Sequence, residues 1–357
     1  MAIAGESHTA LMLGDARAAD EALAHSPLLL SQLADPIGRG KQGGRTTTTP
    51  VPGIDVAAFQ HPNGAVINWA DVAAAGYKFV AVKATEGDYY VNPWAGSDMS
   101  VARYVGMYVT PYHFAIPNVS GGAQQAQFAV EYSGYATGSQ MLAPMLDIEY
   151  DPYMDSDGTN MCYGLSASRM VAWISAFVTT ERSLTGQYPV IYTTANWWDI
   201  CTNDSTAFGS DPMWIAAYGF TSPPMPAGWP AWTFWQNTSA GTVPGVDTPG
   251  GTDLDTFNTG LPGLIDPGGQ VTNFGTKVAL QLNALAALAK QPLNYTATGL
   301  PPGLLINTAG MISGVIGGVV APSQVTKPVT YQVTITASNT TGTVSTVSFP
   351  WQVTTTS

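Results

Sequence analysis

The feature that most constrains the fold is the alternation of short apolar runs with helix-period patterns from Val51 to about Leu264. Strands that alternate with helices indicate an α/β domain with a mostly parallel sheet. The early strands are followed by helical patterns, whereas the last few follow one another with short connections. We therefore predict a modified TIM-like β/α barrel over residues 51–267, with its functional side chains at the C-terminal ends of the strands.

One apolar run, Ala143–Tyr150, ends in two acids one residue apart, Asp147 and Glu149. The lead-in does not alternate, as expected of a parallel strand buried on both faces. Side chains at i and i+2 share a face, so the two carboxyl groups are expected about 7 Å apart along the strand. Two such acids cannot both ionise cheaply, which separates a proton donor from a charge stabiliser. A solvated strand end, with its acids paired to Lys or Arg, is the alternative.

Other polar and aromatic side chains lie at or just past predicted strand ends and can converge on the same face. Acids with aromatic rings fit sugar chemistry, in which a protonated carboxyl donates to the glycosidic oxygen. Core packing is the alternative for the aromatics, and a hydrogen-bonded core position is the alternative for His113. The further acids are Asp55 and Asp253. The predicted substrate contacts are Glu86, Tyr112, His113, Trp214, Tyr218 and Gln236.

The charge balance excludes several classes of partner. The formal net charge is −12, and 10% of the residues are charged. Nucleic-acid binding needs basic stripes, and a polybasic membrane contact needs clustered Lys and Arg, so neither is expected. No apolar run approaches the roughly 20 residues of a membrane-spanning helix. The sequence has no glycine-rich phosphate cradle and no nucleophile elbow, and we predict neither a cofactor nor a metal.

The two cysteines, Cys162 and Cys201, can be buried thiols, a metal pair or one disulfide. No His cluster lies nearby in the sequence, which disfavours the metal pair. A disulfide fits a protein that works outside the cytosol.

Residues 1–50 are predicted to be an N-terminal segment and linker. Ala16–Leu33 fits one helix of moderate amphipathicity, and residues 38–50 have the Gly- and Thr-rich composition of a linker. A docking helix, a remnant pro-region and a disordered tail are the interpretations of the leading segment. No secretory signal is recognisable, because Glu6 and Asp15 precede the first basic residue.

From about residue 268 onward the composition shifts to Thr, Val, Ser and Gly. Tyr331–Ala337 alternates with a period of two, and Val344–Val353 does nearly the same. These patterns predict a small all-β sandwich over residues 268–357. Its Thr and Ser faces fit an inert spacer as well as a binding surface.

Seven motifs resemble, in order along the chain, those of the glycoside hydrolase family 25 muramidases. The resemblance covers essentially all of residues 51–264, and the ordered set is far more specific than any single motif. The motifs are Gly53-Ile54-Asp55-Val56, Val82-Lys83-Ala84-Thr85-Glu86-Gly87, Tyr112-His113-Phe114, Leu146-Asp147-Ile148-Glu149, Trp214-Ile215-Ala216-Ala217-Tyr218, Trp235-Gln236 and Asp253-Leu254-Asp255.

This resemblance implies an enzyme that cleaves the β-1,4 bond between N-acetylmuramic acid and N-acetylglucosamine in bacterial peptidoglycan, with retention. It assigns Glu149 as the general acid/base and Asp147 as the stabiliser of the substrate's N-acetyl group during attack on the anomeric carbon. Asp55 and Asp253 would line the cleft, with Asp255 as the alternative to Asp253. Carboxylates about 7 Å apart fall in the range of inverting enzymes. Substrate-assisted retention removes this conflict, because no enzyme nucleophile has to reach the ring.

Two further segments carry a resemblance. The surroundings of Cys162 and Cys201 are similar to a secreted subgroup of the family in which the two cysteines form a disulfide. Tyr295–Leu304, followed by Gly310–Gly314, resembles the immunoglobulin-like modules of bacterial and phage surface proteins, which implies adhesion or spacing.

A second hypothesis treats the chain as a wall-glycan-binding component of a surface or virion assembly, with hydrolysis secondary or absent. It is motivated by the missing signal peptide, the N-terminal segment and the immunoglobulin-like module. The segment or the module could attach the chain to a particle. An extracellular or particle-associated location fits both hypotheses. An endolysin mounted on a particle would combine them.

Overall fold

The computed structural model describes residues 50–138, 140–248, 250–317 and 328–354. The predicted helix over Ala16–Leu33 and almost all of the predicted linker lie outside these residues. The chain divides into two compact units. Within the described residues, the first unit comprises Pro52–Tyr135 and Ala143–Phe257, and the second comprises residues 50–51, Ala136–Leu142 and the chain from Asn258 onward.

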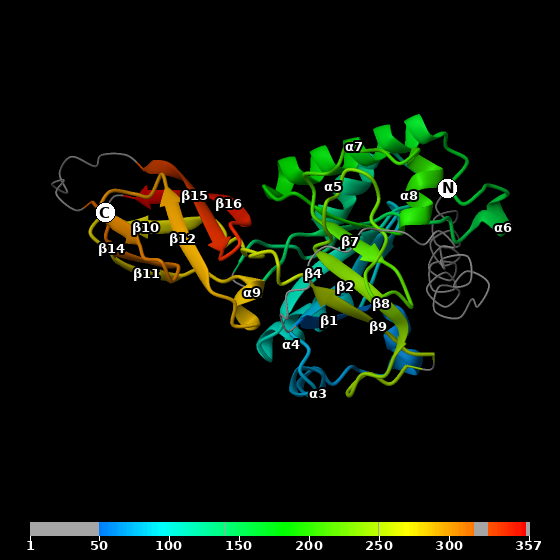
Figure 1. The fold of residues 1–357 in the computed structure, drawn as a ribbon, viewed down its shortest axis with the longest axis horizontal. Helices are drawn as coiled ribbons and strands as arrows, with labels where there is room; N and C mark the ends of the chain where they lie inside the picture. The colour runs from blue at the N-terminus through cyan, green and yellow to red at the C-terminus, as the bar shows by residue number, and fades with distance from the viewer. Residues whose placement is uncertain (1–49, 139, 249, 318–327, 355–357) are drawn as a thin grey trace, which may run out of the picture. The chain divides into compact units, whose positions relative to one another are not determined.

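The first unit is a closed barrel (Figure 1). Its nine-stranded sheet has the order β1-β9-β8-β7-β6-β5-β4-β2-β3, and β1 also pairs with β2, which closes the sheet. Pairing is parallel from β1 through β2, β4, β5, β6, β7 and β8, whereas β9 is antiparallel to β8 and β3 is antiparallel to β2. The strands are β1 (Val51–Val56), β2 (Phe79–Glu86), β3 (Tyr90–Val91), β4 (Tyr108–Phe114), β5 (Met145–Asp147), β6 (Val190–Thr193), β7 (Met213–Ala216), β8 (Phe234–Gly241) and β9 (Thr252–Phe257).

Helices connect the early strands, as the sequence predicts. In the described part of the first unit no helix follows β7, so the last strands are joined by irregular segments. The predicted β/α barrel is therefore confirmed. The helical segments are η1 (Ala58–Gln60), η2 (Pro62–Gly64), α3 (Trp69–Ala74), α4 (Ala95–Tyr104), α5 (Gly122–Tyr132), α6 (Met154–Asp157), α7 (Ala167–Thr185) and α8 (Ala195–Thr202).

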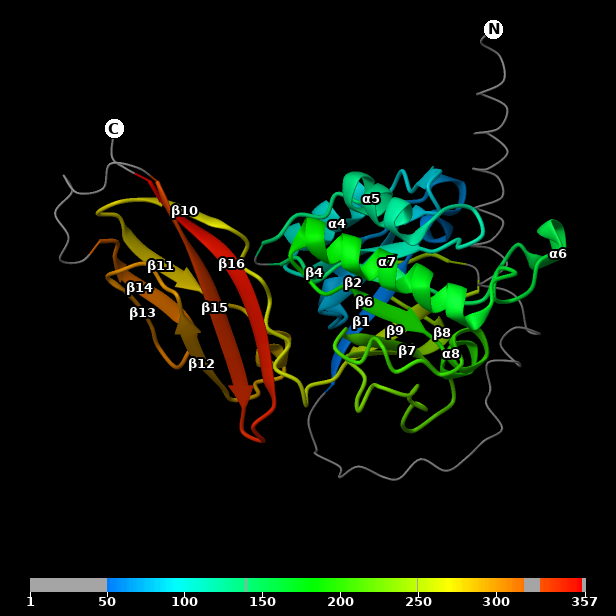
Figure 2. The ribbon, with the colours of Figure 1, turned by 90° about the horizontal axis from the view of Figure 1, so that it is seen from above.

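Helices α5 and α7 lie side by side on the outside of the barrel (Figure 2). The apolar face of α7 is buried through Met170, Ile174 and Phe177. Close approach depends on Gly122, the first residue of α5, because a Cβ there would lie 2.1 Å from the Trp173 carbonyl oxygen. A glycine at this contact thus fixes how closely the two helices pack.

Strand β2 continues through Thr85 and Glu86, which pair with β3. The end of β5 differs from the sequence-based prediction. The run that ends in the acid pair leaves the sheet at Asp147. Glu149 therefore stands just beyond the strand, on a segment held by the Ile148 amide, which donates to the Tyr192 carbonyl.

The second unit contains two sheets, with strand orders β10-β16-β15-β12 and β11-β14-β13. Apolar side chains from both sheets form one core cluster, with Ile312, Val333, Ile335, Phe349 and Trp351 nearly inaccessible to solvent. This arrangement agrees with the predicted immunoglobulin-like module. Its elements are β10 (Gln270–Asn273), β11 (Lys277–Gln281), α9 (Leu285–Leu288), β12 (Leu293–Thr298), β13 (Leu304–Ile306), β14 (Met311–Val315), β15 (Val329–Asn339) and β16 (Val344–Thr354).

Among the described residues, no helix combines the length and the apolarity needed to cross a bilayer.

Glu181 on α7 is a buried carboxyl away from the barrel mouth. It is 2% exposed, and its Oε2 has no hydrogen-bond partner among the described residues. Burial raises the pKa of Glu181 to about 8, whereas an unfolded glutamate titrates at about 4.3. Between these two values the folded chain retains a proton that the unfolded chain has released. The stability of the first unit therefore falls as pH rises through this window.

We expect Glu181→Gln to remove this pH dependence. The unfolding free energy of the variant minus that of the wild type should increase with pH, by up to about 1.4 kcal/mol per pH unit between about pH 5 and pH 8. Denaturant unfolding at several pH values measures the gap, with Glu131→Gln on exposed α5 surface as the control. A gap that stays constant with pH would contradict the buried neutral carboxyl.

Candidate active site

Acidic side chains gather at the C-terminal end of the barrel strands. Asp55 near the end of β1, Asp147 at the end of β5 and Glu149 just beyond it are each 5–7% exposed. Asp255 on β9 is 2% exposed, whereas Asp253 on the same strand is only partly buried. Strands that are far apart in the sequence thus supply carboxyl groups to one small region. Mutual repulsion and burial must both act there.

The central pair is Asp147 and Glu149. Burial raises the pKa of Glu149 to about 8, with the Lys83 ammonium opposing the rise and the Asp55 carboxylate adding to it. Burial, and then the charge of Glu149, also raise the pKa of Asp147 well above its usual range. Asp147 Oδ1 is buried and has no hydrogen-bond partner among the described residues. The pair therefore offers a retained proton and a free acceptor atom.

A buried ion pair lies beneath these acids on β2. Lys83 Nζ is 2.8 Å from Glu86 Oε2, and both side chains are at most 1% exposed. The other carboxylate oxygen, Glu86 Oε1, accepts hydrogen bonds from the hydroxyls of Tyr89 at 2.8 Å and Tyr153 at 2.6 Å. The Lys83 ammonium also lies 4.6 Å from the Phe114 ring centroid. Both Glu86 oxygens are thus engaged within the protein.

Gln236 on β8 connects the acids to two tyrosines. Its Nε2 donates to Asp55 Oδ2 at 2.8 Å. Its Oε1 accepts from the hydroxyls of Tyr192 at 2.9 Å and Tyr218 at 2.5 Å. Since an ionised carboxylate can only accept, Asp55 requires the amide N–H of Gln236 to face it, which leaves the amide oxygen to the two tyrosines.

Trp214 on β7 contacts one acid and two aromatic side chains of the site. Its indole Nε1 donates to Asp255 Oδ1 at 2.6 Å. Its ring packs edge-on against Tyr112 of β4 and Tyr192 of β6, with centroids 6.1 Å and 4.6 Å away. The structure thus brings Tyr112, Trp214, Tyr218 and Gln236 together with the acids, as the sequence predicts.

His113 is not part of this group. Its Nδ1 is 2.9 Å from Thr85 Oγ1, and its Nε2 is 3.1 Å from Gln125 Oε1 on α5. The ring also stacks on Phe177 of α7. Burial lowers the pKa of His113 to about 4. This position between the barrel and its helices is that of the hydrogen-bonded core histidine considered as the alternative.

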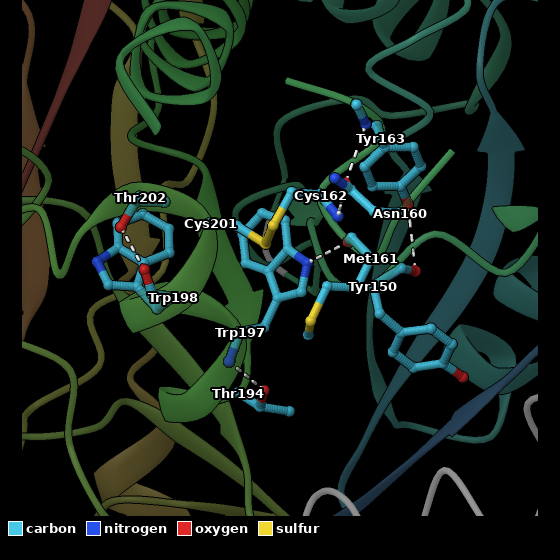
Figure 3. Close-up of a disulfide and its surroundings, with 11 residues drawn as sticks. Tyr150, Asn160, Met161, Cys162, Tyr163, Thr194, Trp197, Trp198, Cys201 and Thr202 are labelled. Carbon is cyan, nitrogen blue, oxygen red and sulfur yellow. Dashed lines mark hydrogen bonds between the residues drawn. A yellow bond between two sulfur atoms is a disulfide. The ribbon is translucent and has the colours of Figure 1, made fainter. Parts of the chain in front are cut away.

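A disulfide joins Cys162 to Cys201 and links the segment after β5 to helix α8 (Figure 3). Beside it, Trp197 Nε1 donates to the Met161 carbonyl at 2.9 Å. Tyr163 has φ 58° in the left-handed region, and its hydroxyl donates to the Ala115 and Tyr150 carbonyls. These contacts hold Tyr150, the residue that follows Glu149, so the disulfide lies beside the segment that carries this acid.

Sequence patterns missed Lys83, Tyr153 and Tyr192 as parts of the site. The available signal for Lys83 was a lone cation inside the apolar run that forms β2. Tyr153 lies in a loop and Tyr192 in an apolar strand, so neither carried a distinctive pattern. Among the described residues, no three or more His, Cys, Asp or Glu side chains have the arrangement of a metal site.

Comparison with known proteins identifies this barrel. The sequence model of Glycosyl hydrolases family 25 matches residues 54–246, more than half of the chain. The chain belongs to glycosyl hydrolase family 25. The model of the family described as Putative Ig domain matches residues 261–354 in the second unit. The chain is thus a glycoside hydrolase with a C-terminal Ig-like module.

Relatives of this family-25 chain cover its first unit. Lysozyme M1 of Streptomyces globisporus is 39% identical over 217 residues, which are 60% of this chain and 70% of that protein. The N,O-diacetylmuramidase of Chalaropsis sp is 40% identical over 197 residues, 53% of this chain and 89% of that protein. The solved lysozyme of Streptomyces coelicolor has a TM-score of 0.55 at 38% identity and covers 59% of this chain and 93% of its own.

For the family-25 barrel we predict that Cys162→Ser with Cys201→Ser lowers the unfolding free energy by about 3–4 kcal/mol, as expected for a closed loop of 39 residues. Activity should fall more steeply with temperature than in the wild type, because the segment after Glu149 loses an anchor. Thermal unfolding followed in parallel with hydrolysis measures both effects. Wild type treated with reductant serves as the matched control, and unchanged melting in both would contradict the prediction.

Proposed function

We propose that the first unit cleaves the β-1,4 bond between N-acetylmuramic acid and N-acetylglucosamine in bacterial peptidoglycan, with retention. The observation that carries the proposal is a buried glutamic acid beside a second acid at the mouth of a family-25 barrel. Lysozyme and muramidase relatives that are 39% and 40% identical support this bond specificity.

In this proposal Glu149 is the general acid/base. Its pKa of about 8 keeps the carboxyl protonated at neutral pH, as an acid that must donate to a leaving oxygen requires. The proton passes from Glu149 to the glycosidic oxygen while the bond from that oxygen to the anomeric carbon breaks. Glu149 then takes a proton from the incoming water and returns to its starting state.

Asp147 is proposed to orient the substrate's N-acetyl group. Its unpartnered Oδ1 can accept a hydrogen bond from the acetamido N–H. The acetamido oxygen would then attack the anomeric carbon, and water would later displace it from the opposite side, so that two inversions give retention. Asp55 and Asp253 are proposed to line the cleft, where negative charge favours the positively charged transition state.

The flanking regions are proposed to place the enzyme rather than to catalyse. We infer that the chain acts on the wall outside the cytosol, free or mounted on a particle as an endolysin would be. Residues 1–50 or the module over residues 268–357 would supply the attachment. No observation favours the alternative of a glycan-binding component without hydrolysis, since the four acids of the proposed site are all present at the barrel mouth.

We expect Glu149→Gln to reduce hydrolysis about 100- to 10,000-fold, because the amide cannot give its proton to the leaving oxygen. Wild-type activity should fall as pH rises through about 8, where Glu149 loses its proton. Purified peptidoglycan is digested and the new reducing ends are identified by mass spectrometry.

The exposed substitution Glu131→Gln is the matched control and should leave the rate unchanged. Muramic acid at the new reducing ends supports the proposed bond. Glucosamine at those ends, or full activity in a folded Glu149→Gln protein, refutes the assignment.

A further inference from the structure

The side chain of Gln236 on β8 is hydrogen-bonded to three other parts of the barrel. Its Nε2 donates to Asp55 Oδ2 of β1 at 2.8 Å. Its Oε1 accepts from the hydroxyls of Tyr192 on β6 at 2.9 Å and of Tyr218, just after β7, at 2.5 Å. An amide offers two donors and two acceptor lone pairs. The protein itself therefore occupies three of these four positions, on a side chain that is only 4% exposed.

The backbone of Gln236 is held on both sides as well. It pairs with Ala216 of β7 and with Asp255 of β9, and its carbonyl accepts from the Ala217 amide at 3.1 Å. The register of β8 against β9 shifts directly after Gln236, as in a β-bulge. Bulges next to active sites re-aim a side chain. Both the base and the amide of this side chain are thus fixed.

Tyr192 connects the Gln236 amide to the acid pair. The backbone carbonyl of Tyr192 accepts from the Ile148 amide at 3.0 Å, and Ile148 stands between the two acids in the chain. The Tyr192 hydroxyl donates to Gln236. One residue of β6 therefore holds both the segment that carries the acid pair and the amide that donates to Asp55.

We propose that Gln236 is a positioning residue that fixes the Asp55 carboxylate relative to the acid pair and contributes little to substrate affinity. The inference rests on the proposed function, in which Asp55 lines the cleft and its negative charge favours the transition state. Burial raises the pKa of Asp55 to about 6, and the hydrogen bond from Gln236 opposes this rise. The same bond thus orients Asp55 and favours its ionised form.

Gln236→Met keeps a similar length but removes both ends of this link. We expect kcat on soluble glycan fragments of peptidoglycan to fall about 10- to 100-fold, the factor that corresponds to losing a hydrogen bond to a charged group. KM should stay within about twofold, because the lost interaction acts in the transition state. The acid limb of the pH profile, where Asp55 takes up a proton, should move to higher pH. Gln127→Met on the exposed surface of α5 is the control. A raised KM with unchanged kcat would make Gln236 a substrate contact and overturn the proposal.

Gln236→Glu tests the need for a donor at the same position. The introduced carboxyl can donate to Asp55 only while it holds a proton, because its ionised form can only accept. We expect the ratio of its kcat to that of wild type to fall as pH rises, with Gln127→Glu as the control. A ratio that does not change with pH contradicts the proposed role. The other titratable groups that interact with Asp55 or with the two tyrosines are all acids, namely Asp147, Glu149, Asp253 and Asp255.

Tyr192→Phe tests the link to the acid pair. Removing one neutral hydrogen bond should lower kcat about 2- to 10-fold. In Gln236→Met the Tyr192 hydroxyl has already lost its acceptor, so the same substitution should cause no further loss there. Equal losses in both backgrounds would show that Tyr192 acts independently of Gln236 and would refute the link.

A spectroscopic measurement follows Asp55 without relying on activity. In protein labelled with carboxyl carbon-13 aspartate, the Asp55 signal is identified by its loss in Asp55→Asn. NMR should show that it titrates at higher pH in Gln236→Met than in wild type. An unchanged titration overturns the proposal, and Gln236→Glu, which is close to Gln in size, replaces Gln236→Met in this comparison if that variant does not fold. Wild type that releases no muramic-acid ends would refute the proposed function, while the titration would still decide whether Gln236 holds Asp55.

Discussion

Desolvation of several carboxyl groups at one rim of the barrel is the constraint on which the first unit depends. The parallel strands β1 and β5 end at this rim and the antiparallel β9 starts there, so their acids meet although they are distant in sequence. Burial raises the pKa of every one of them, and their charges act against one another. Such a group is stable only if the scaffold supplies a cation, hydrogen-bond donors or retained protons. The structure supplies all three, through Lys83, Gln236 and the carboxyl groups themselves.

Lys83 links this charge balance to the position of Glu149. Its ammonium opposes the rise in pKa of both Asp147 and Glu149. Its partner Glu86 accepts a hydrogen bond from Tyr153, which lies in the segment after β5. Because β5 ends before Glu149, the sheet holds this segment through the bond from the Ile148 amide to the Tyr192 carbonyl of β6 and not through regular strand pairing. The ion pair on one side and the disulfide on the other therefore anchor the segment that carries it.

The sequence predicted those features that depend on residues close together in the chain. The alternation of strand and helix patterns predicted the barrel, and an apolar run that ends in acids identified the pair at Asp147 and Glu149. The Lys83–Glu86 pair escaped because residues three apart in a regular strand point to opposite faces. A register shift between Lys83 and Thr85 changes that alternation. The bond from Gln236 to Asp55 spans 181 positions, so only the closed barrel reveals it.

The four-stranded sheet of the second unit differs from the acidic mouth of the barrel, because its strands are uncharged. Its strands β10, β12, β15 and β16 carry no charged residue, and on the exposed face of this sheet hydroxyl groups bond one another. The Oγ1 of Thr334 lies 2.9 Å from Ser348 Oγ, and that of Thr336 lies 3.2 Å from Thr346 Oγ1. Hydroxyls satisfied in pairs have fewer donors and acceptors left for a ligand, and a face without charge exerts no long-range steering. This face therefore fits a spacer better than a binding surface.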